Sequence, residues 1–95
     1  MALYFDWDTG NSSKSVEKHG VANREAESVF YDKGRVVRLS KRGTGTEIRY
    51  LCYGISDLGR LLTAYFIVKN GKIRIIGTRV ARKEEREYYQ QRQIG

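Results

Sequence analysis

The chemistry that this sequence suggests centres on arginine, and a predicted β-hairpin brings two arginines together. Asn70 and Gly71 lie between two runs rich in β-forming residues, residues 59–69 and 72–79. Asn-Gly in that setting is a strong signal for a two-residue hairpin turn. The turn predicts an antiparallel register in which Leu62 faces Arg79, Ala64 faces Gly77, Phe66 faces Ile75 and Val68 faces Ile73.

This register puts Arg60 and Arg79 at one end of an otherwise apolar face. Arg60 lies two positions from Leu62, so the arginines are diagonal neighbours, ~7–8 Å apart at the backbone, and both side chains could reach one phosphate. Two guanidiniums there repel each other unless an anion lies between them. The alternative is that each arginine pairs with a carboxylate. The candidates are Glu84, Glu85 and Asp57.

Glu85 and Tyr89 are the candidates for proton transfer. They are four residues apart in residues 82–92, a predicted helix without glycine, and therefore share a helix face. Arginine, glutamate and tyrosine suit phosphodiester transfer without a metal, because arginine binds the phosphate and offsets developing charge. Either Glu85 or Tyr89 could orient the ribose 2′-hydroxyl or exchange a proton with it. Tyrosines could also stack on bases of single-stranded RNA.

The sequence contains one cysteine and one histidine, and neither points to a cofactor. Cys52 alternates with apolar residues along a predicted strand, which indicates a packed thiol rather than a nucleophile. His19 precedes Gly20 at a predicted helix end, where a cation interacts well with the terminal carbonyls. Zinc ligand spacing and glycine-rich nucleotide motifs are both absent. We expect no metal and no cofactor.

The charge of the chain is unevenly distributed. The net charge is +7, and residues 1–34 hold four Lys/Arg against six Asp/Glu, a balance of −2. Residues 35–95 hold fourteen basic residues against five acidic ones, a balance of +9. Such segregation indicates a polyanionic partner, RNA in particular, or an acidic protein partner. The alternative is a basic surface that only maintains solubility. No run of apolar residues approaches a membrane span, and no secretory signal is visible, so we expect a cytoplasmic protein.

A chain of 95 residues forms one domain, residues 1–95. The periodicity predicts a short strand over residues 3–7 and a first helix from Asp8 or Thr9 to His19. A second helix is predicted over residues 23–31, and the later elements are strands and a final helix. The predicted strands cover residues 36–39, 47–54, 59–69 and 72–79, with a basic turn at residues 41–45. Strands grouped without crossover helices indicate an α+β domain with an antiparallel sheet.

Several short motifs recur in an order that resembles one known family. They are Phe5-Asp6-Trp7-Asp8, Lys18-His19-Gly20-Val21, Glu25-Ala26 with Val29-Phe30 and Asp32, Gly59-Arg60-Leu61-Leu62, Ile73-Arg74-Ile75-Ile76, Thr78-Arg79, and Glu85-Arg86 with Tyr89. In this order and spacing the chain resembles the BrnT family of type II toxins, relatives of the RelE-like ribonucleases.

The resemblance implies a RelE-like α+β fold, with a sheet of four to five strands, two N-terminal helices and one C-terminal helix. It implies an endoribonuclease that inhibits translation, with Arg60, Arg79, Glu85 and Tyr89 as catalytic residues. The predicted RNA-binding residues are Arg74, Arg82, Lys83 and Arg86. The implied partner is a BrnA-like ribbon-helix-helix antitoxin in a 2:2 complex, which would bring the chain to DNA only indirectly.

Two other classes of function fit the same residues. A module that binds RNA or the ribosome without cutting needs the same basic surface, because phosphate affinity comes from Lys and Arg alone. A purely structural subunit needs no pairing of Arg60 with Arg79.

Overall fold

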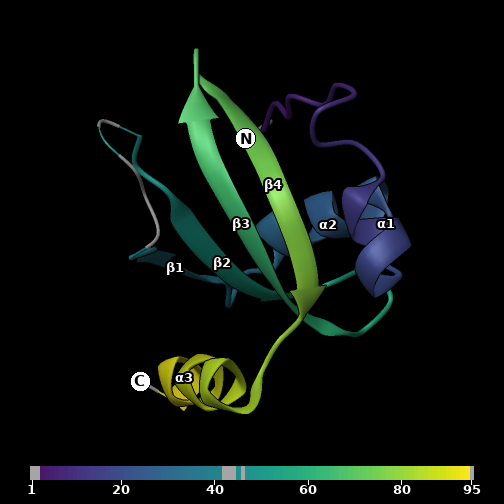
Figure 1. Cartoon of the computed structure of the whole chain (residues 1–95). Helices are drawn as coiled ribbons and strands as arrows, with labels where there is room; N and C mark the ends of the chain where they lie inside the picture. The colour runs from purple at the N-terminus through teal and green to yellow at the C-terminus, as the bar shows by residue number, and fades with distance from the viewer. Residues whose placement is uncertain (1–2, 42–44, 46, 95) are drawn as a thin grey trace.

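The described residues of the chain fold into an α+β domain with three helices, a 3₁₀ turn and a four-stranded sheet (Figure 1). The computed structural model describes residues 3–41, 45 and 47–94. The elements in chain order are α1 Lys14–His19, α2 Asn23–Ser28, η1 Val29–Tyr31, β1 Val36–Leu39, β2 Tyr50–Ile55, β3 Leu61–Lys69, β4 Lys72–Val80 and α3 Lys83–Ile94. The predicted fold class is therefore confirmed. Within the described residues, no helix is both long enough and apolar enough to span a membrane.

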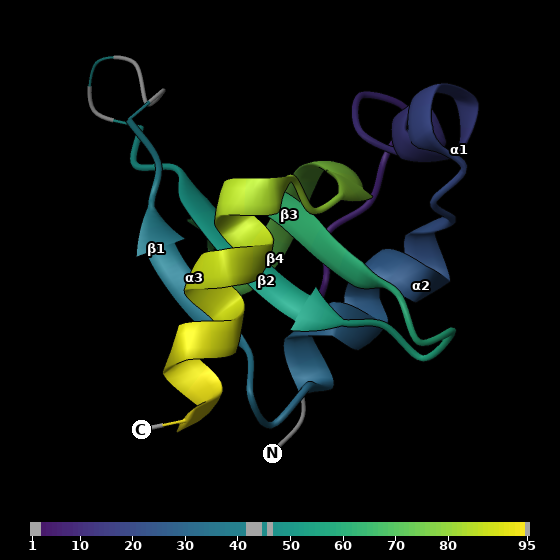
Figure 2. The ribbon, with the colours of Figure 1, turned by 90° about the horizontal axis from the view of Figure 1, so that it is seen from below.

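The sheet is antiparallel throughout and has the strand order β1-β2-β3-β4. Helix α2 and η1 pack on one face, and α3 crosses the other (Figure 2). Two neighbouring residues of β2 show this division. Cys52 belongs to the core beside η1, while the Tyr53 ring contacts the Tyr88 ring of α3 at 6.1 Å. Side chains alternate between the faces of a strand, so each face carries its own set of contacts.

The hairpin between β3 and β4 has the predicted turn but only part of the predicted register. Asn70 and Gly71 have φ values of 53° and 74°, as a type I′ turn requires. Val68 pairs with Ile73, and Phe66 with Ile75, as predicted. A register shift between Tyr65 and Phe66 then changes every later pair.

Beyond this bulge, Thr63 pairs with Arg79 and Leu62 pairs with Val80. The predicted pairing of Leu62 with Arg79 is therefore wrong. Because side chains alternate with a period of two, one extra residue in β4 moves Arg79 to the opposite face of the sheet. Arg79 consequently faces α3, and not the apolar core.

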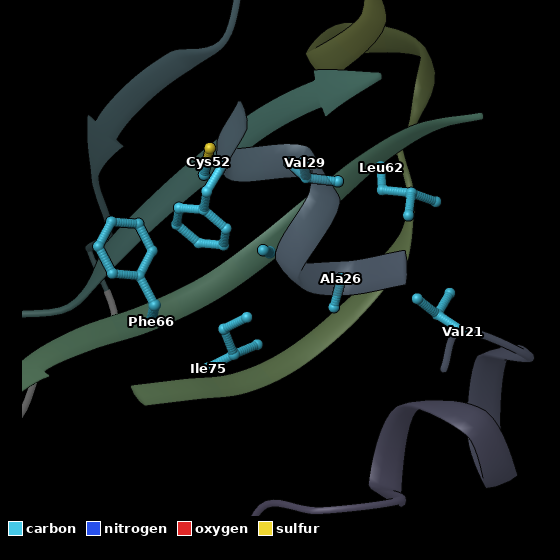
Figure 3. Close-up of a cluster of buried hydrophobic side chains, with 9 residues drawn as sticks. Val21, Ala26, Val29, Cys52, Leu62, Phe66 and Ile75 are labelled. Atoms are coloured by element: carbon cyan, nitrogen blue, oxygen red, sulfur yellow. The ribbon is translucent and has the colours of Figure 1, made fainter. Parts of the chain in front are cut away.

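The core lies between the sheet and α2 with η1 (Figure 3). Its central ring is Phe30, which meets Phe5 and Phe66 edge to face at 5.5 and 5.0 Å. Cys52 is fully buried in this cluster, and burial raises the pKa of its thiol to about 12. The interpretation of Cys52 as a packed, unreactive thiol is confirmed. The buried cluster comprises Val21, Ala26, Val29, Phe30, Cys52, Leu62, Ala64, Phe66 and Ile75.

The N-terminal segment covers the outer edge of β4 without forming the predicted strand over residues 3–7. Phe5 makes a single parallel bridge to Ile73. Further along the edge, Asn11 Nδ2 donates to the carbonyl of Ile75 at 2.9 Å, and Ser15 Oγ accepts the Thr78 N–H at 2.7 Å. A strand edge needs such cover, because its free N–H and C=O groups otherwise recruit other chains.

The first helix begins at Lys14, later than predicted. Asp8 stabilises a turn instead, since its carboxylate accepts the Gly10 N–H at 2.7 Å and its carbonyl accepts the Ser12 N–H at 2.8 Å. The predicted end is confirmed, because Gly20 follows the helix with a φ of 67°. Of the predicted basic turn, residues 42–44 lie outside the described residues, and the strand predicted from residue 47 begins at Tyr50.

Candidate functional site

Arg79 of β4 is held in one orientation by Tyr65 and Glu85. Its Nε donates to Tyr65 Oη at 3.1 Å, and Nη2 donates to the same oxygen. Nη1 donates to Glu85 Oε1 at 2.6 Å, and Nη2 to Oε2 at 2.8 Å. A longer bond of 3.4 Å joins Nη1 to the carbonyl of Val80. A guanidinium has five N–H donors, so these five bonds use all of them.

Glu85 connects this arginine to the start of α3. Its Oε1 also accepts the backbone N–H of Arg82 at 2.8 Å and the hydroxyl of Thr63 at 3.0 Å. Glutamate at the third helical position, bonded to the N–H of the residue before the helix, is half of a capping box. Burial raises the pKa of the Glu85 carboxyl, but hydrogen bonds from Arg79, Arg82 and Thr63 outweigh it. The net pKa lies below the ordinary value.

A basic groove of about 440 Å³ opens beside Arg79 and Tyr65. Helix α1 forms one wall, and the groove crosses β4 to the start of α3. No acidic residue is among the described residues that line it. The lining residues are Lys14, Ser15, Lys18, His19, Ser40, Arg49, Tyr65, Ile76, Gly77, Thr78, Arg79 and Arg82. Six of the twelve are lysine, arginine or histidine, so the groove is suited to an anion.

The sequence prediction missed four of these basic residues: Lys14, Lys18, His19 and Arg49. Three of them belong to residues 1–34, which have a net negative charge and were therefore not expected to bind an anion. The spacing of Lys14 and Lys18, four residues apart, does place both on one face of a helix. That spacing was the only local signal, and the packing of α1 against β4 was needed to bring it to Arg79.

Arg60 does not lie with Arg79, and the prediction that both face one phosphate is wrong. Its Nε donates to Glu25 Oε2 at 2.8 Å, and Nη2 donates to Glu25 Oε1 and to the Gly20 carbonyl. Glu25 is buried, with 4% of its surface exposed, and also accepts the Ser56 hydroxyl at 2.7 Å. Hydrogen bonding from Arg60 holds the pKa of the Glu25 carboxyl below its usual value.

Arg60 therefore fastens the β2–β3 turn to α2 and to the end of α1. The alternative of carboxylate pairing holds for both arginines. Among the carboxylates that the sequence suggested, Glu85 is the partner of Arg79, and the partner of Arg60 was not anticipated. No short sequence signal links Arg60 to a glutamate 35 positions away.

Tyr89 is part of a structural contact outside the groove. It shares a face of α3 with Glu85, as predicted, but is only 7% exposed, and its hydroxyl donates to Asp32 Oδ2 at 2.6 Å. The same carboxylate accepts the N–H groups of Ile55 at 2.7 Å and Gly34 at 2.9 Å. Burial and the negative charge of Asp32 raise the pKa of Tyr89 to about 12.

Only one of the four predicted RNA-binding residues, Arg82, lines the groove. Arg74 forms ion pairs with Asp8 at 2.9 Å and Asp6 at 3.5 Å, which fasten the N-terminal segment to β4. Lys83 and Arg86 are exposed on α3, outside the groove lining. Within residues 3–41, 45 and 47–94, no group of three or more His, Cys, Asp or Glu could hold a metal ion.

The family model described as the ribonuclease toxin BrnT of a type II toxin-antitoxin system matches residues 7–85. The chain belongs to the BrnT toxin family. Every lining residue of the groove lies within the matched region, whereas Tyr89 lies beyond it. Comparison with individual curated proteins gave no match. BrnT toxins are ribonucleases, and a type II system pairs the toxin with a protein antitoxin.

Proposed function

We propose that this BrnT toxin is a metal-independent endoribonuclease and that the basic groove binds its RNA substrate. The observation that carries the proposal is the set of cations around one fixed network, Arg79–Tyr65–Glu85. In the proposed reaction the 2′-oxygen attacks the adjacent phosphorus while its proton passes to a base. The bond from phosphorus to the 5′-oxygen breaks, and that oxygen takes up a proton. The products are a 2′,3′-cyclic phosphate and a 5′-hydroxyl.

The walls of the groove supply the phosphate contacts. Lys14 of α1 and Arg82, next to the start of α3, are exposed cations that line it. Arg79 acts differently, because its five donors are already used in the free protein. We propose that Arg79 is a positioning residue for Tyr65. The Tyr65 oxygen accepts two N–H groups of Arg79, so its own O–H is left to donate to a phosphate oxygen.

Proton transfer is assigned to His19. Histidine is the side chain that most often acts as a general acid or base, and His19 lines the groove at the end of α1. Glu85 is less suited to accept the 2′-hydroxyl proton, since its lowered pKa makes it a weaker base. The Tyr89 hydroxyl donates a hydrogen bond to Asp32, outside the groove, and has no place in this proposed reaction.

A cleavage assay tests the proposal. We expect purified protein to generate new 5′-hydroxyl ends on labelled RNA in EDTA. Tyr65→Phe and His19→Gln should each lower the rate by about 10²-fold or more. Tyr88→Phe, a tyrosine outside the groove, is the matched control and should cleave at the wild-type rate. Loss of all activity in EDTA with recovery in Mg²⁺ would contradict the mechanism.

A second candidate function is RNA or ribosome binding without cleavage. It is favoured by the saturated hydrogen bonding of Arg79, since the groove cations can bind RNA without this arginine. The same assay separates the two functions. Binding of RNA that leaves every strand intact, with and without added metal, would support the binding module.

We also propose that the antitoxin is a BrnA-like ribbon-helix-helix protein and that the assembly contains two toxins on one antitoxin dimer. Family membership and the basic groove support a partner with an acidic segment that masks or flanks the groove. The toxin would then contact DNA only through its partner. Light scattering of the coexpressed complex would give the 2:2 mass, and a partner that leaves the toxin monomeric and active would contradict this assembly.

A further inference from the structure

The two outer edges of the sheet differ. The β4 edge is covered by the N-terminal segment, whereas β1 pairs with β2 alone among the described residues. The Ser40 N–H donates to the Arg49 carbonyl at 2.8 Å, so the backbone groups of Ser40 point toward β2. Backbone groups alternate in direction along a strand, so those of Arg38 and Val36 also point toward β2. Within that alternation the N–H and C=O groups of Val37 and Leu39 point away from β2. No other described residue bonds to these groups, so β1 is an open edge.

Aliphatic side chains are exposed along this open edge. Val37 is 51% exposed and Leu39 is 69% exposed. Their cross-strand partners, Cys52 and Tyr50, lie in or against the core, so both side chains extend the core face of the sheet beyond the reach of η1. Natural sheets protect an exposed apolar edge unless another chain pairs with it.

The opposite side of the same edge is basic. The guanidiniums of Arg38 and Arg92 lie 4.0 and 4.9 Å from the centre of the Tyr88 ring. A second hollow of about 440 Å³ lies at the start of β1, and Lys33 and Arg35 line it with Arg92. No acidic residue is among its described lining residues. None of these four cations forms an ion pair with a described carboxylate.

We propose that the β1 edge, residues 33–39 with Arg92, is the docking site of an extended acidic segment of a partner protein. The segment adds a fifth strand by bonding to Val37 and Leu39. Its residues alternate between aliphatic side chains, which cover Val37 and Leu39, and carboxylates, which meet the cations on the α3 side. The proposal rests on membership of a toxin family with a protein antitoxin, and not on the cleavage mechanism.

The position of the edge also explains how docking would control the groove. β1 runs from the hollow at Lys33 and Arg35 to Ser40, which lines the RNA groove. A strand added along β1 and continued past Leu39 therefore arrives at the rim of the groove. RNA alone does not account for this surface, since phosphates need neither aliphatic contacts nor a free strand edge.

Peptide titration of the full, isotopically labelled chain tests the proposal. The probes are two capped peptides of about ten residues, one with alternating valine and glutamate and one with alternating valine and lysine. We expect the acidic peptide to shift and protect the backbone amides of Val37 and Leu39, and the basic peptide to leave them unchanged. Unmoved β1 amides, or equal binding of both peptides, would overturn the proposal.

Variants test which residues bind the peptide, and an RNA probe tests whether the edge binds RNA instead. Arg35→Glu with Arg92→Glu should weaken the acidic peptide by about tenfold or more, while Lys69→Glu with Lys72→Glu at the hairpin tip is the matched control. Val37→Pro removes one outward N–H and should weaken binding to a similar extent, with the amide spectrum reporting that the fold is kept. If an oligouridylate shifts the β1 amides and the acidic peptide does not, the edge is an RNA track and the docking proposal is wrong. Arg35 and Arg92 do not line the RNA groove, so the Arg35→Glu/Arg92→Glu variant should still cleave RNA. Retained cleavage with weakened peptide binding keeps a failure of the docking proposal distinct from a failure of the ribonuclease proposal.

Discussion

The Glu85 carboxylate binds both terminal nitrogens of Arg79, at 2.6 and 2.8 Å, with only 13% and 12% of the two side chains exposed. This contact joins β4 to the first turn of α3. It also fixes the guanidinium against Tyr65 at the groove. The two residues therefore stabilise the fold and, in the proposed mechanism, also position Tyr65.

Glu85→Gln should destabilise the fold by about 2 kcal/mol. Arg79 would then be a largely buried cation without its counter-charge, although the amide oxygen of glutamine could still accept one hydrogen bond. Urea unfolding measures the change. Glu84→Gln, one residue earlier on the exposed side of α3, is the matched control and should stay within about 0.5 kcal/mol of wild type.

The pH dependence of stability should follow the same carboxylates. Glu85 and Glu25 both have pKa values below the ordinary 4.5 in the folded state. The unfolded chain therefore binds more protons as the pH falls below about 4.5, and stability is lost as the pH passes through the lowered folded values. Denaturation at a series of pH values should show this loss. The free energy of unfolding should change less steeply with pH in Glu85→Gln than in wild type. A variant slope equal to that of wild type would remove Glu85 from the explanation.

Charge reversal in the groove should weaken RNA binding. Lys14→Glu with Lys18→Glu changes two groove residues, whereas Lys69→Glu with Lys72→Glu makes the same change in net charge at the far hairpin tip. A plot of log K against log salt concentration has a negative slope, and each lost phosphate contact should reduce its magnitude by roughly 0.7 for single-stranded RNA. Filter binding at several salt concentrations measures the slopes. Equal losses in the two double variants would mean that net charge, and not the groove, governs binding.

The arrangement of the sheet could be predicted because its signals are local. Asn70-Gly71 fixed the turn, and the pairs nearest to it were correct. The bulge at Tyr65 could not be predicted, since one extra residue in β4 leaves the alternation of apolar residues plausible on either side. That single residue determined which face receives Arg79, and with it the composition of the site.

Contacts between segments that are distant in the sequence account for the other differences between the predictions and the structure. Glu25 lies within the predicted second helix, and nothing in the sequence marked it as the buried partner of Arg60. The N-terminal segment was predicted as a strand over residues 3–7, but among the described residues of β4 its backbone bonds only to Ile73. The side chains of Asp6, Asp8, Asn11 and Ser15 make its other bonds to β4. Such side-chain contacts have no periodicity that a sequence pattern could show.

Glycines in the strands should differ sharply in their tolerance of alanine. A Cβ at Gly54 would lie 2.7 Å from the carbonyl oxygen of Val29 and 2.8 Å from its Cγ1, whereas a Cβ at Gly77 meets nothing within 4 Å. The Val29 oxygen is backbone and cannot rotate away. Gly54→Ala should therefore cost about 1–3 kcal/mol, and Gly77→Ala should be close to neutral. Thermal or urea unfolding of both variants tests the difference, and equal stability would mean that η1 shifts freely over the sheet.

The Tyr89 hydroxyl is bonded to Asp32 and does not reach the groove. Tyr89→Phe removes that bond and should lower stability by about 1 kcal/mol without changing the rate of RNA cleavage. The folded pKa of Tyr89 is raised from 10.0 to about 12, so the native state keeps its proton more tightly than the unfolded chain does. Its stabilising contribution is present below pH 10 and is lost as the pH rises toward 12. Tyr89→Phe should accordingly lose less stability than wild type over that alkaline range. If the variant instead unfolds like wild type but fails to cleave RNA, Tyr89 acts in the reaction, and the active site extends along α3 beyond the groove.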